Sequence, residues 1–201
     1  MKNMLIERYE KDSRGRVLVQ FDDGSRCRLE KSTAEAYSLS EGAEIAPEDW
    51  EGICAEELLP EAKNRVLDIL ERADRTERQL REKLRADLYP EEVVGRAIEF
   101  AKHYGYLDDA RYAGNYVRRY QGEKSTAEMR SVLRQRGISG ELIDRAFEEE
   151  LTAQPEDVIR RWLEKKHYDA ESAGEKEKRK VFQFLLRKGF RSEEIRRCMD
   201  L

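Results

Sequence analysis

Two adjacent aspartates, Asp108 and Asp109, are the first residues in this sequence whose type and spacing could support chemistry. Paired carboxylates can bind a divalent metal ion or exchange a proton with a substrate. However, no third carboxylate follows at the spacing of a metal-binding loop, and His103 lies across Gly105 from the pair. An aspartate at the start of a helix accepts hydrogen bonds from free N–H groups and faces the positive helix end. We therefore interpret the pair as the start of a helix.

A second acidic pair, Asp22 and Asp23, is followed at once by Gly24. Glycine adopts positive φ without steric cost, so an Asp-Gly step favours a hairpin turn. A metal site here is the weaker interpretation, because the turn chemistry already explains these residue types.

The first 46 residues are predicted to form a small strand-rich domain. Residues 3–29 are rich in branched and aromatic side chains, which predicts three strands. A short helix is expected to begin at Ser32 or Thr33 and to end near Gly42.

The remaining candidates for metal binding or nucleophilic catalysis are three cysteines and two histidines. Cys27, Cys54 and Cys198 are far apart and form no CxxC pair, and only His103 and His167 could complete a metal site. This pattern predicts neither a disulfide framework nor a zinc site, and it fits a reducing cytoplasm. The sequence contains no glycine-rich phosphate loop and no nucleophile paired with a base. We therefore expect no catalytic residues, no metal and no cofactor, and we do not expect an enzyme.

Charged residues make up 41% of the 201 residues, against about 25% in an average soluble domain. The net charge is −4, but residues 1–60 carry −6 and residues 155–201 carry +3. The basic excess at the C-terminal end permits binding of nucleic acid without requiring it. No apolar stretch is long enough for a signal peptide or a membrane span, so we expect a cytoplasmic protein without membrane contact.

The part of the chain after Pro47 is helical in pattern and repeats itself. Residues 75–100 superpose on residues 124–149 after a shift of 49, and a further shift of 52 brings in residues 177–199. When the three copies are aligned, apolar residues occupy four equivalent positions, which we call columns. They are Leu80 with Met129 and Val181, Leu84 with Leu133 and Leu185, Val94 with Ile143 and Ile195, and Ala97 with Ala146 and Cys198.

Each copy is preceded by another predicted helix, over 56–73, 109–121 and 155–168. The chain is therefore expected to be mainly all-α, with three tandem three-helix repeats in an elongated, slightly curved array behind the small β-rich N-terminal domain. The expected boundaries are 1–46 for the N-terminal domain and 56–107, 108–152 and 155–201 for the repeats.

The ends of the second helix in each repeat carry recognisable signals. Thr76-x-x-Gln79 and Ser125-x-x-Glu128 have the form of a capping box. The third copy has Glu177 and Lys180 at these positions, so its second helix is expected to begin elsewhere or to fray. The expected left-handed C-caps are Gly137 and Gly189.

Basic residues occupy positions of these second helices that the core does not need. They are Arg78, Arg81 and Arg85 in the first repeat, Arg130 and Arg134 in the second, and Arg179 and Arg187 in the third. Nearby basic residues could widen this face: Arg118, Arg119, Arg136, Lys188 and Arg191. Their spacing predicts a basic band suited to phosphates or to an acidic protein surface.

A solvated helix face is the competing interpretation, because Glu77, Glu82, Glu123 and Glu128 could neutralise much of this charge. The tyrosines allow two interpretations as well: Tyr104, Tyr106, Tyr112, Tyr116 and Tyr120 could stack on bases. The last three recur at four-residue spacing, which favours packing of one helix face. Trp162 is expected to anchor the core of the third repeat.

Four stretches resemble the RecX family of bacterial RecA regulators: "RTERQLREKL" at 75–84, "GYLDDARYAGNYV" at 105–117, "LRQRGISGELIDRA" at 133–146 and "LLRKGFRSEEIRR" at 185–197. The resemblance covers residues 56–201, and the strand-rich start is similar to the extra N-terminal region of longer members. The first repeat departs from the family pattern at "DLYP", where a glycine-containing turn is usual.

The resemblance implies a monomeric, non-enzymatic protein that binds the RecA nucleoprotein filament along its groove. It also implies contact with single-stranded and double-stranded DNA, inhibition of ATP hydrolysis and strand exchange, and a role in recombination, DNA repair and the SOS response.

Two other functions are weighed against this one. The three-helix units could instead form a sequence-independent DNA-binding protein of helix-turn-helix type. A sequence-specific reader is disfavoured, because no second helix shows the Asn, Gln and Arg cluster that reads bases.

Overall fold

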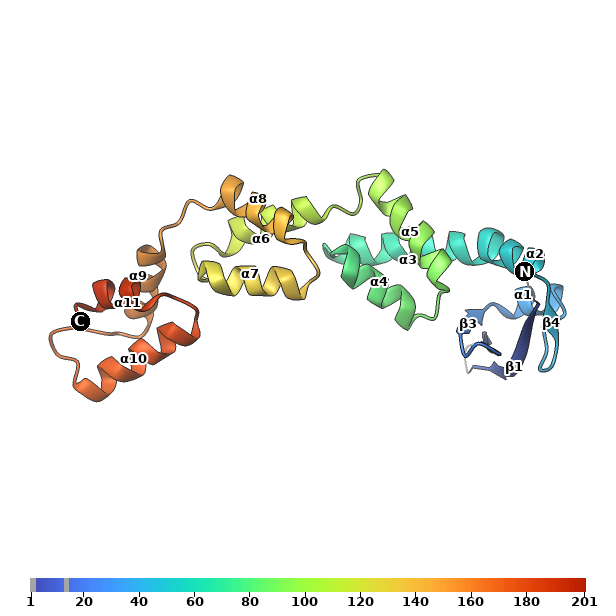
Figure 1. The fold of residues 1–201 in the computed structure, drawn as a ribbon, viewed down its shortest axis with the longest axis horizontal. Helices are drawn as coiled ribbons and strands as arrows, with labels where there is room; N and C mark the ends of the chain where they lie inside the picture. Colours follow the sequence, from blue (N-terminus) through green and yellow to red (C-terminus); the bar gives the residue numbers. More distant parts are fainter. Residues whose placement is uncertain (1–2, 13–14) are drawn as a thin grey trace. The chain divides into compact units, whose positions relative to one another are not determined.

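The computed structural model describes residues 3–12 and 15–201. The chain divides into two compact units, Met1–Asp108 and Asp109–Leu201, and helices dominate both of them (Figure 1). The first unit contains a small sheet and the first three-helix repeat, and the second unit contains the other two repeats.

The sheet is antiparallel and has four strands in the order β3-β2-β1-β4. Its strands are β1 (Met4–Lys11), β2 (Val17–Phe21), β3 (Arg26–Leu29) and β4 (Glu44–Ile45). Val17, Val19 and Phe21 of β2 are buried at every second position, which is the alternation of a strand with one face in a core. The expected turn joins β2 to β3, with Gly24 at a φ of 79°.

Two details of this region differ from the sequence prediction. Three strands were expected, but β4 adds a fourth by pairing with the start of β1. Its two residues are too few to show an alternating pattern. The short helix α1 (Lys31–Ala36) ends well before Gly42, because Leu39 turns into the core and its N–H bonds back to the carbonyl of Ala34.

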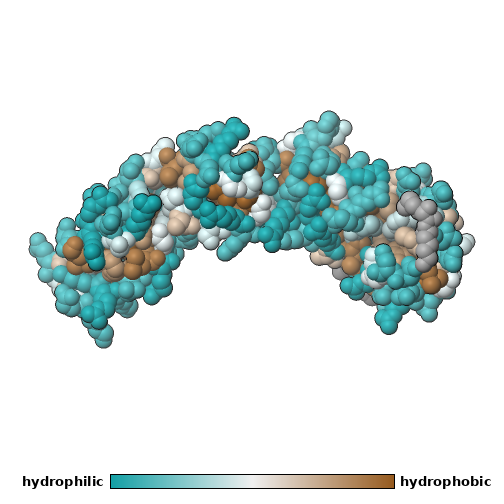
Figure 2. All heavy atoms as spheres, in the orientation of Figure 1, coloured by the Kyte–Doolittle hydropathy of each residue, from teal (hydrophilic) through white to brown (hydrophobic). Residues whose placement is uncertain are grey.

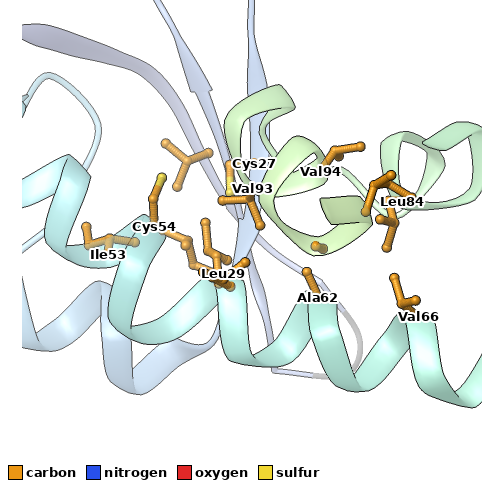
Figure 3. Close-up of a cluster of buried hydrophobic side chains, with 14 of the residues drawn as sticks. Cys27, Leu29, Ile53, Cys54, Ala62, Val66, Leu84, Val93 and Val94 are labelled. Carbon is orange, nitrogen blue, oxygen red and sulfur yellow. The ribbon is translucent and has the colours of Figure 1, made fainter. Parts of the chain in front are cut away.

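The sheet and the first repeat share one hydrophobic core. Three helical segments follow one another without a break: α2 (Pro47–Gly52), the π-helical η1 (Ile53–Leu58) and α3 (Leu59–Arg72). Figure 3 shows Cys27 and Leu29 of β3 beside Cys54 of η1 and Val93 of α5 (Glu91–His103). The N-terminal region and the first repeat are therefore one packing unit.

In the first repeat, α3 and α5 pack against each other, and α4 (Glu77–Ala86) packs against both. The predicted capping box is complete, because Thr76 Oγ1 accepts from the Gln79 N–H at 3.3 Å and Gln79 Oε1 accepts from the Thr76 N–H at 3.2 Å. Leu88 lies in the "DLYP" turn with a φ of 69°. This left-handed conformation costs a non-glycine residue about 1–2 kcal/mol.

The second unit holds the other two repeats. The second repeat consists of α6 (Asp109–Tyr120), α7 (Thr126–Gln135) and α8 (Gly140–Glu150). The third consists of α9 (Pro155–Lys165), α10 (Glu175–Arg187) and α11 (Ser192–Met199). Each has its own hydrophobic cluster. The four predicted columns are buried in all three repeats, except that Cys198 is half-buried.

The helix ends confirm most of the predicted signals. Gly137 and Gly189 adopt φ values of 88° and 85°, as left-handed C-caps require. Ser125 caps α7 through the Glu128 N–H, but the reciprocal bond of a capping box is absent among the described residues. The second helix of the third repeat does begin elsewhere, since Gly174 is its N-cap.

The second and third repeats meet at a hydrogen-bonded joint. Trp162 Nε1 donates to the Glu123 carbonyl at 3.0 Å, and Arg161 donates to the Gly122 carbonyl at 3.0 Å. The hydroxyl of Ser125 donates to the Lys188 carbonyl at 2.5 Å. Trp162 also packs edge-on against a phenylalanine of α10 in the third core, as predicted.

Candidate basic interface

The acidic pair lies at the start of α6, with Asp109 as its first helical residue and Asp108 directly before it. Within the described residues, no group of three or more His, Cys, Asp or Glu side chains could hold a metal ion. Burial raises the pKa of the Cys54 thiol to about 12 and also raises that of Cys27. Both thiols are therefore protonated and unreactive at neutral pH.

In the first repeat, carboxylates neutralise the predicted basic face. Arg85 binds Glu91 through two hydrogen bonds of 2.7 Å. Arg81 donates to Glu77 at 2.8 Å, and Arg78 donates to Glu82 at 2.9 Å. These contacts are typical of a solvated helix face, and they leave little free positive charge on α4.

The ion pairs of Glu77 are partly buried, and their contribution to stability is expected to depend on pH. Burial alone would raise the pKa of Glu77, but hydrogen bonds from Lys102 at 2.6 Å and Arg81 outweigh it and lower that pKa. The hydrogen bonds from Arg85 likewise lower the pKa of Glu91 at the surface.

Acidification is expected to weaken the first unit through Glu77. Its pKa is lower in the folded chain, so the stabilisation is complete above the unfolded value of about 4.3 and disappears as the pH falls through the folded value. Glu77→Gln should lower the free energy of unfolding by about 1 kcal/mol at pH 7. The melting temperature of this variant should also fall less steeply as the solution is acidified, which flattens the acid side of the plot of melting temperature against pH. Glu82→Gln, which removes an exposed carboxylate of the same helix, is the control. Equal flattening by both variants would contradict this explanation.

In the second repeat, several of the predicted basic residues have structural partners. Arg130 forms an ion pair with Asp144 and lies 4.4 Å from the Phe147 ring centroid. Arg118 donates to Glu150 at 2.9 Å, and this hydrogen bond lowers the pKa of that carboxyl. The Arg136 guanidinium covers the ring of Tyr116 at 5.0 Å and donates to the hydroxyl of Tyr112.

Five predicted residues remain as exposed cations. They are Arg119, Arg134, Arg179, Arg187 and Arg191. Within residues 3–12 and 15–201, no carboxylate forms an ion pair with any of them. Lys188, another predicted residue, is less open, because its ammonium lies 3.9 Å from Glu128. Among the basic residues predicted for this face, those that form no ion pair with a described residue therefore lie in the second unit.

The basic columns of the first two repeats do not continue into the third. Applying the repeat shifts places Phe182 in the column of Arg81 and Arg130, and Leu186 in the column of Arg85 and Arg134. Both apolar side chains pack against the third core. The basic residues of the third repeat therefore lie elsewhere on its surface.

Sequence reasoning missed four lysines of the third repeat that line a groove with Arg187. They are Lys165, Lys166, Lys176 and Lys180. The spacing of Lys176, Lys180 and Phe184 along one helix face was visible in the sequence, but the approach of α9 to that face was not.

The aromatic residues divide into packed and exposed groups. Tyr112, Tyr116 and Tyr120 pack against the second core, which confirms the packing interpretation. Tyr104 and Tyr106 are 61% and 48% exposed. Elsewhere, hydrophilic side chains cover most of the visible surface, with small hydrophobic areas between them (Figure 2).

The family descriptions that match the chain follow its repeats in order. The first, second and third three-helix domains of RecX match residues 62–100, 108–146 and 154–199. The regulatory protein RecX of Caldanaerobacter subterraneus is 31% identical over 98% of this chain and 100% of its own length. The chain belongs to the RecX family.

Other RecX proteins agree with this assignment over the whole chain. The regulatory protein RecX of Clostridioides difficile is 30% identical over 98% of this chain and 94% of its own length. A crystal structure of regulatory protein RecX superposes with a TM-score of 0.64 at 26% identity, covering 98% of this chain and all of that one. The N-terminal sheet therefore lies within the region shared with these RecX proteins. No described helix is long and apolar enough to cross a membrane.

Proposed function

We propose that this RecX-family chain binds the RecA filament on single-stranded DNA and inhibits its ATP hydrolysis and strand exchange. The observation that carries the proposal is the match of all three repeats, in order and at full length, to proteins named regulatory protein RecX. The proposed protein acts by binding, as a monomer in the cytoplasm, and catalyses no reaction of its own.

The distribution of charge supports contact with a nucleoprotein. The chain as a whole is acidic, with a net charge of −4, yet Arg119, Arg134, Arg179 and Arg187 are exposed on the second unit without carboxylate partners among the described residues. Exposed cations that no internal acid neutralises are available to phosphates. We therefore place the DNA-facing surface on the second unit, and the ion-paired arginines of α4 become weaker candidates.

The same cations also favour a second function, sequence-independent binding to DNA without RecA. A protein of this kind would bind naked DNA and the filament equally well at the same salt concentration, because both present the same phosphates. Additional contacts with RecA would instead give the chain a higher affinity for the filament than for naked DNA.

Filament affinity tests the proposal directly. Arg134→Gln with Arg179→Gln should weaken binding to a fluorescently labelled RecA–DNA filament about tenfold at constant salt. The matched control is Arg96→Gln with Arg145→Gln, because each of these arginines pairs with a glutamate on its own helix. The control should change affinity less than about twofold. Equal losses in both variants, or no filament binding by the unaltered chain, would overturn the proposal.

A further inference from the structure

A groove in the third repeat combines a cationic rim with an apolar floor. It lies between the C-terminal end of α9 and one face of α10, and its volume is about 700 Å³. Its lining includes Lys165, Lys166, Lys176, Lys180, Phe184 and Arg187. A volume of this size can enclose part of a small organic molecule.

The sequence of α10 places its share of the groove on one helix face. Lys176, Lys180 and Phe184 follow at four-residue intervals, and Arg187 lies three residues further on. Residues at these spacings lie above one another along a helix. From α9 come Lys165, in its last turn, and Lys166, its C-cap residue.

The positive charge of the groove is not neutralised within the protein. Of the described lining residues, Glu177 is the only acid beside five cations. None of these cations forms an ion pair within the described part of the chain. Instead, Lys165 Nζ lies 5.2 Å from the Trp162 ring and Lys166 Nζ lies 3.8 Å from the Phe184 ring centroid. In contrast, the arginines of α4 are held by carboxylates.

Folding alone explains three of these cations. Lys165 and Lys166 complement the negative C-terminal end of α9, and Arg187 lies in the last turn of α10, where it does the same. Lys176 lies in the first turn of α10, where the positive helix end disfavours a cation, and Lys180 lies one turn further on, beyond the reach of that effect. The first two repeats carry Gln79 and Glu128 in the column of Lys180. The third repeat therefore places one cation here against the local electrostatics and another where the other repeats have none, which points to an anionic ligand.

We propose that this groove binds single-stranded nucleic acid, with phosphates on the lysine rim and one unstacked base on the floor formed by Val181 and Phe184. The inference deepens the proposed function and rests on it for its biological setting. A nucleotide unit combines an anion with a flat apolar body, as this rim and floor require. An Asp- or Glu-rich peptide supplies the anion without the flat body, and a duplex keeps its bases stacked.

Entry of a base exchanges one contact of Phe184 for another. The Lys166 ammonium covers this ring without ligand, and it moves to a phosphate as the base stacks on the ring. Stacking of a base on an aromatic ring is stronger than an exposed cation–π contact, so the exchange favours binding.

Direct binding to a naked oligothymidylate of about 12 nucleotides tests the rim. For the full chain, Lys176→Gln with Lys180→Gln should reduce the slope of log K against log salt by about 1.4, as expected for the loss of two single-strand phosphate contacts. Lys83→Gln with Lys178→Gln makes the same charge change outside the groove and is the control. Equal slopes for both variants would overturn the proposal, and melting curves must show that both remain folded.

The floor is tested separately with an oligonucleotide of the same length that lacks bases. The unaltered chain should bind oligothymidylate about tenfold more tightly than the abasic strand, and Phe184→Leu should abolish this preference while keeping the salt slope. Competition by polyglutamate or by duplex DNA as strong as by the single strand would overturn the proposal. Because RecA is absent, failure here is distinct from failure of filament inhibition, which is measured with RecA present.

Discussion

Deletion of residues 1–46 is expected to unfold the first repeat, even though the match to the first RecX domain begins only at residue 62. The reason is the shared core, in which sheet residues pack against η1, α3 and α5 (Figure 3). The buried sheet residues include Ile6, Val17, Val19, Phe21, Cys27 and Leu29. Truncating one large buried side chain costs about 2–5 kcal/mol. The free-energy cost of removing all six side chains together therefore exceeds the free energy of unfolding of a typical protein, about 5–15 kcal/mol.

Amide hydrogen exchange resolves this prediction helix by helix. In the truncated chain, α3, α4 and α5 should lose protection, whereas α6 to α11 should keep it because their cores are separate. A milder pair of variants keeps the whole chain: Leu29→Ala should destabilise the first unit by about 2–5 kcal/mol, and Leu18→Ala, at a half-buried position of β2, should have a smaller effect. Unchanged protection of α3 to α5 after the deletion would refute the shared core as a source of stability.

Gly189→Ala is expected to destabilise the third repeat by about 2–5 kcal/mol, through backbone strain and overpacking together. Gly189 has a φ of 85°, which alanine adopts only with strain. An added Cβ would also lie 2.9 Å from Ser125 Oγ and 3.1 Å from Ala127 Cβ. The Ser125 hydroxyl cannot move away cheaply, since it caps α7 and donates to the Lys188 carbonyl.

The two tryptophans of the chain, one in each unit, allow a matched control. In a Trp50→Phe background, the fluorescence of Trp162 during denaturant unfolding should report how much stability the third repeat loses through Gly189→Ala. The control is Gly105→Ala in a Trp162→Phe background, because Gly105 has a φ of 69° but an added Cβ there meets no atom within 4 Å. It should cost only the backbone strain of about 1–2 kcal/mol. Equal losses at the two glycines would show that the joint between repeats does not resist the added methyl group.

The repeats could be predicted from sequence because each core column is visible at helical spacing. Leu84, Leu133 and Leu185 occupy one column and are all fully buried. Conversely, β4 was not predicted, because two residues are too few to show an alternating pattern. The core shared by the sheet and the first repeat was not predicted either, because it depends on which apolar faces pack against each other. Neither property is encoded in the spacing of neighbouring residues.

The candidate site was harder to predict because charge pairing depends on tertiary geometry. Arg85 binds Glu91 across the turn between α4 and α5, a contact that i, i+4 spacing does not indicate. Arg118 and Glu150 are far apart in sequence but meet between α6 and α8. In the sequence, the groove lysines are indistinguishable from ordinary surface lysines, because the groove forms only where α9 lies beside α10. Sequence therefore located basic residues, and the structure separated the neutralised ones from the open ones.

The most direct test of the proposed function is the rate of ATP hydrolysis by RecA on single-stranded DNA, titrated with this chain while filament length is followed in parallel. Filament regulation predicts a dose-dependent fall in the rate that is already clear with less than one copy of this chain per RecA. No change at equimolar chain, in a buffer where the chain still binds naked single-stranded DNA, would contradict filament regulation and leave sequence-independent DNA binding as the function.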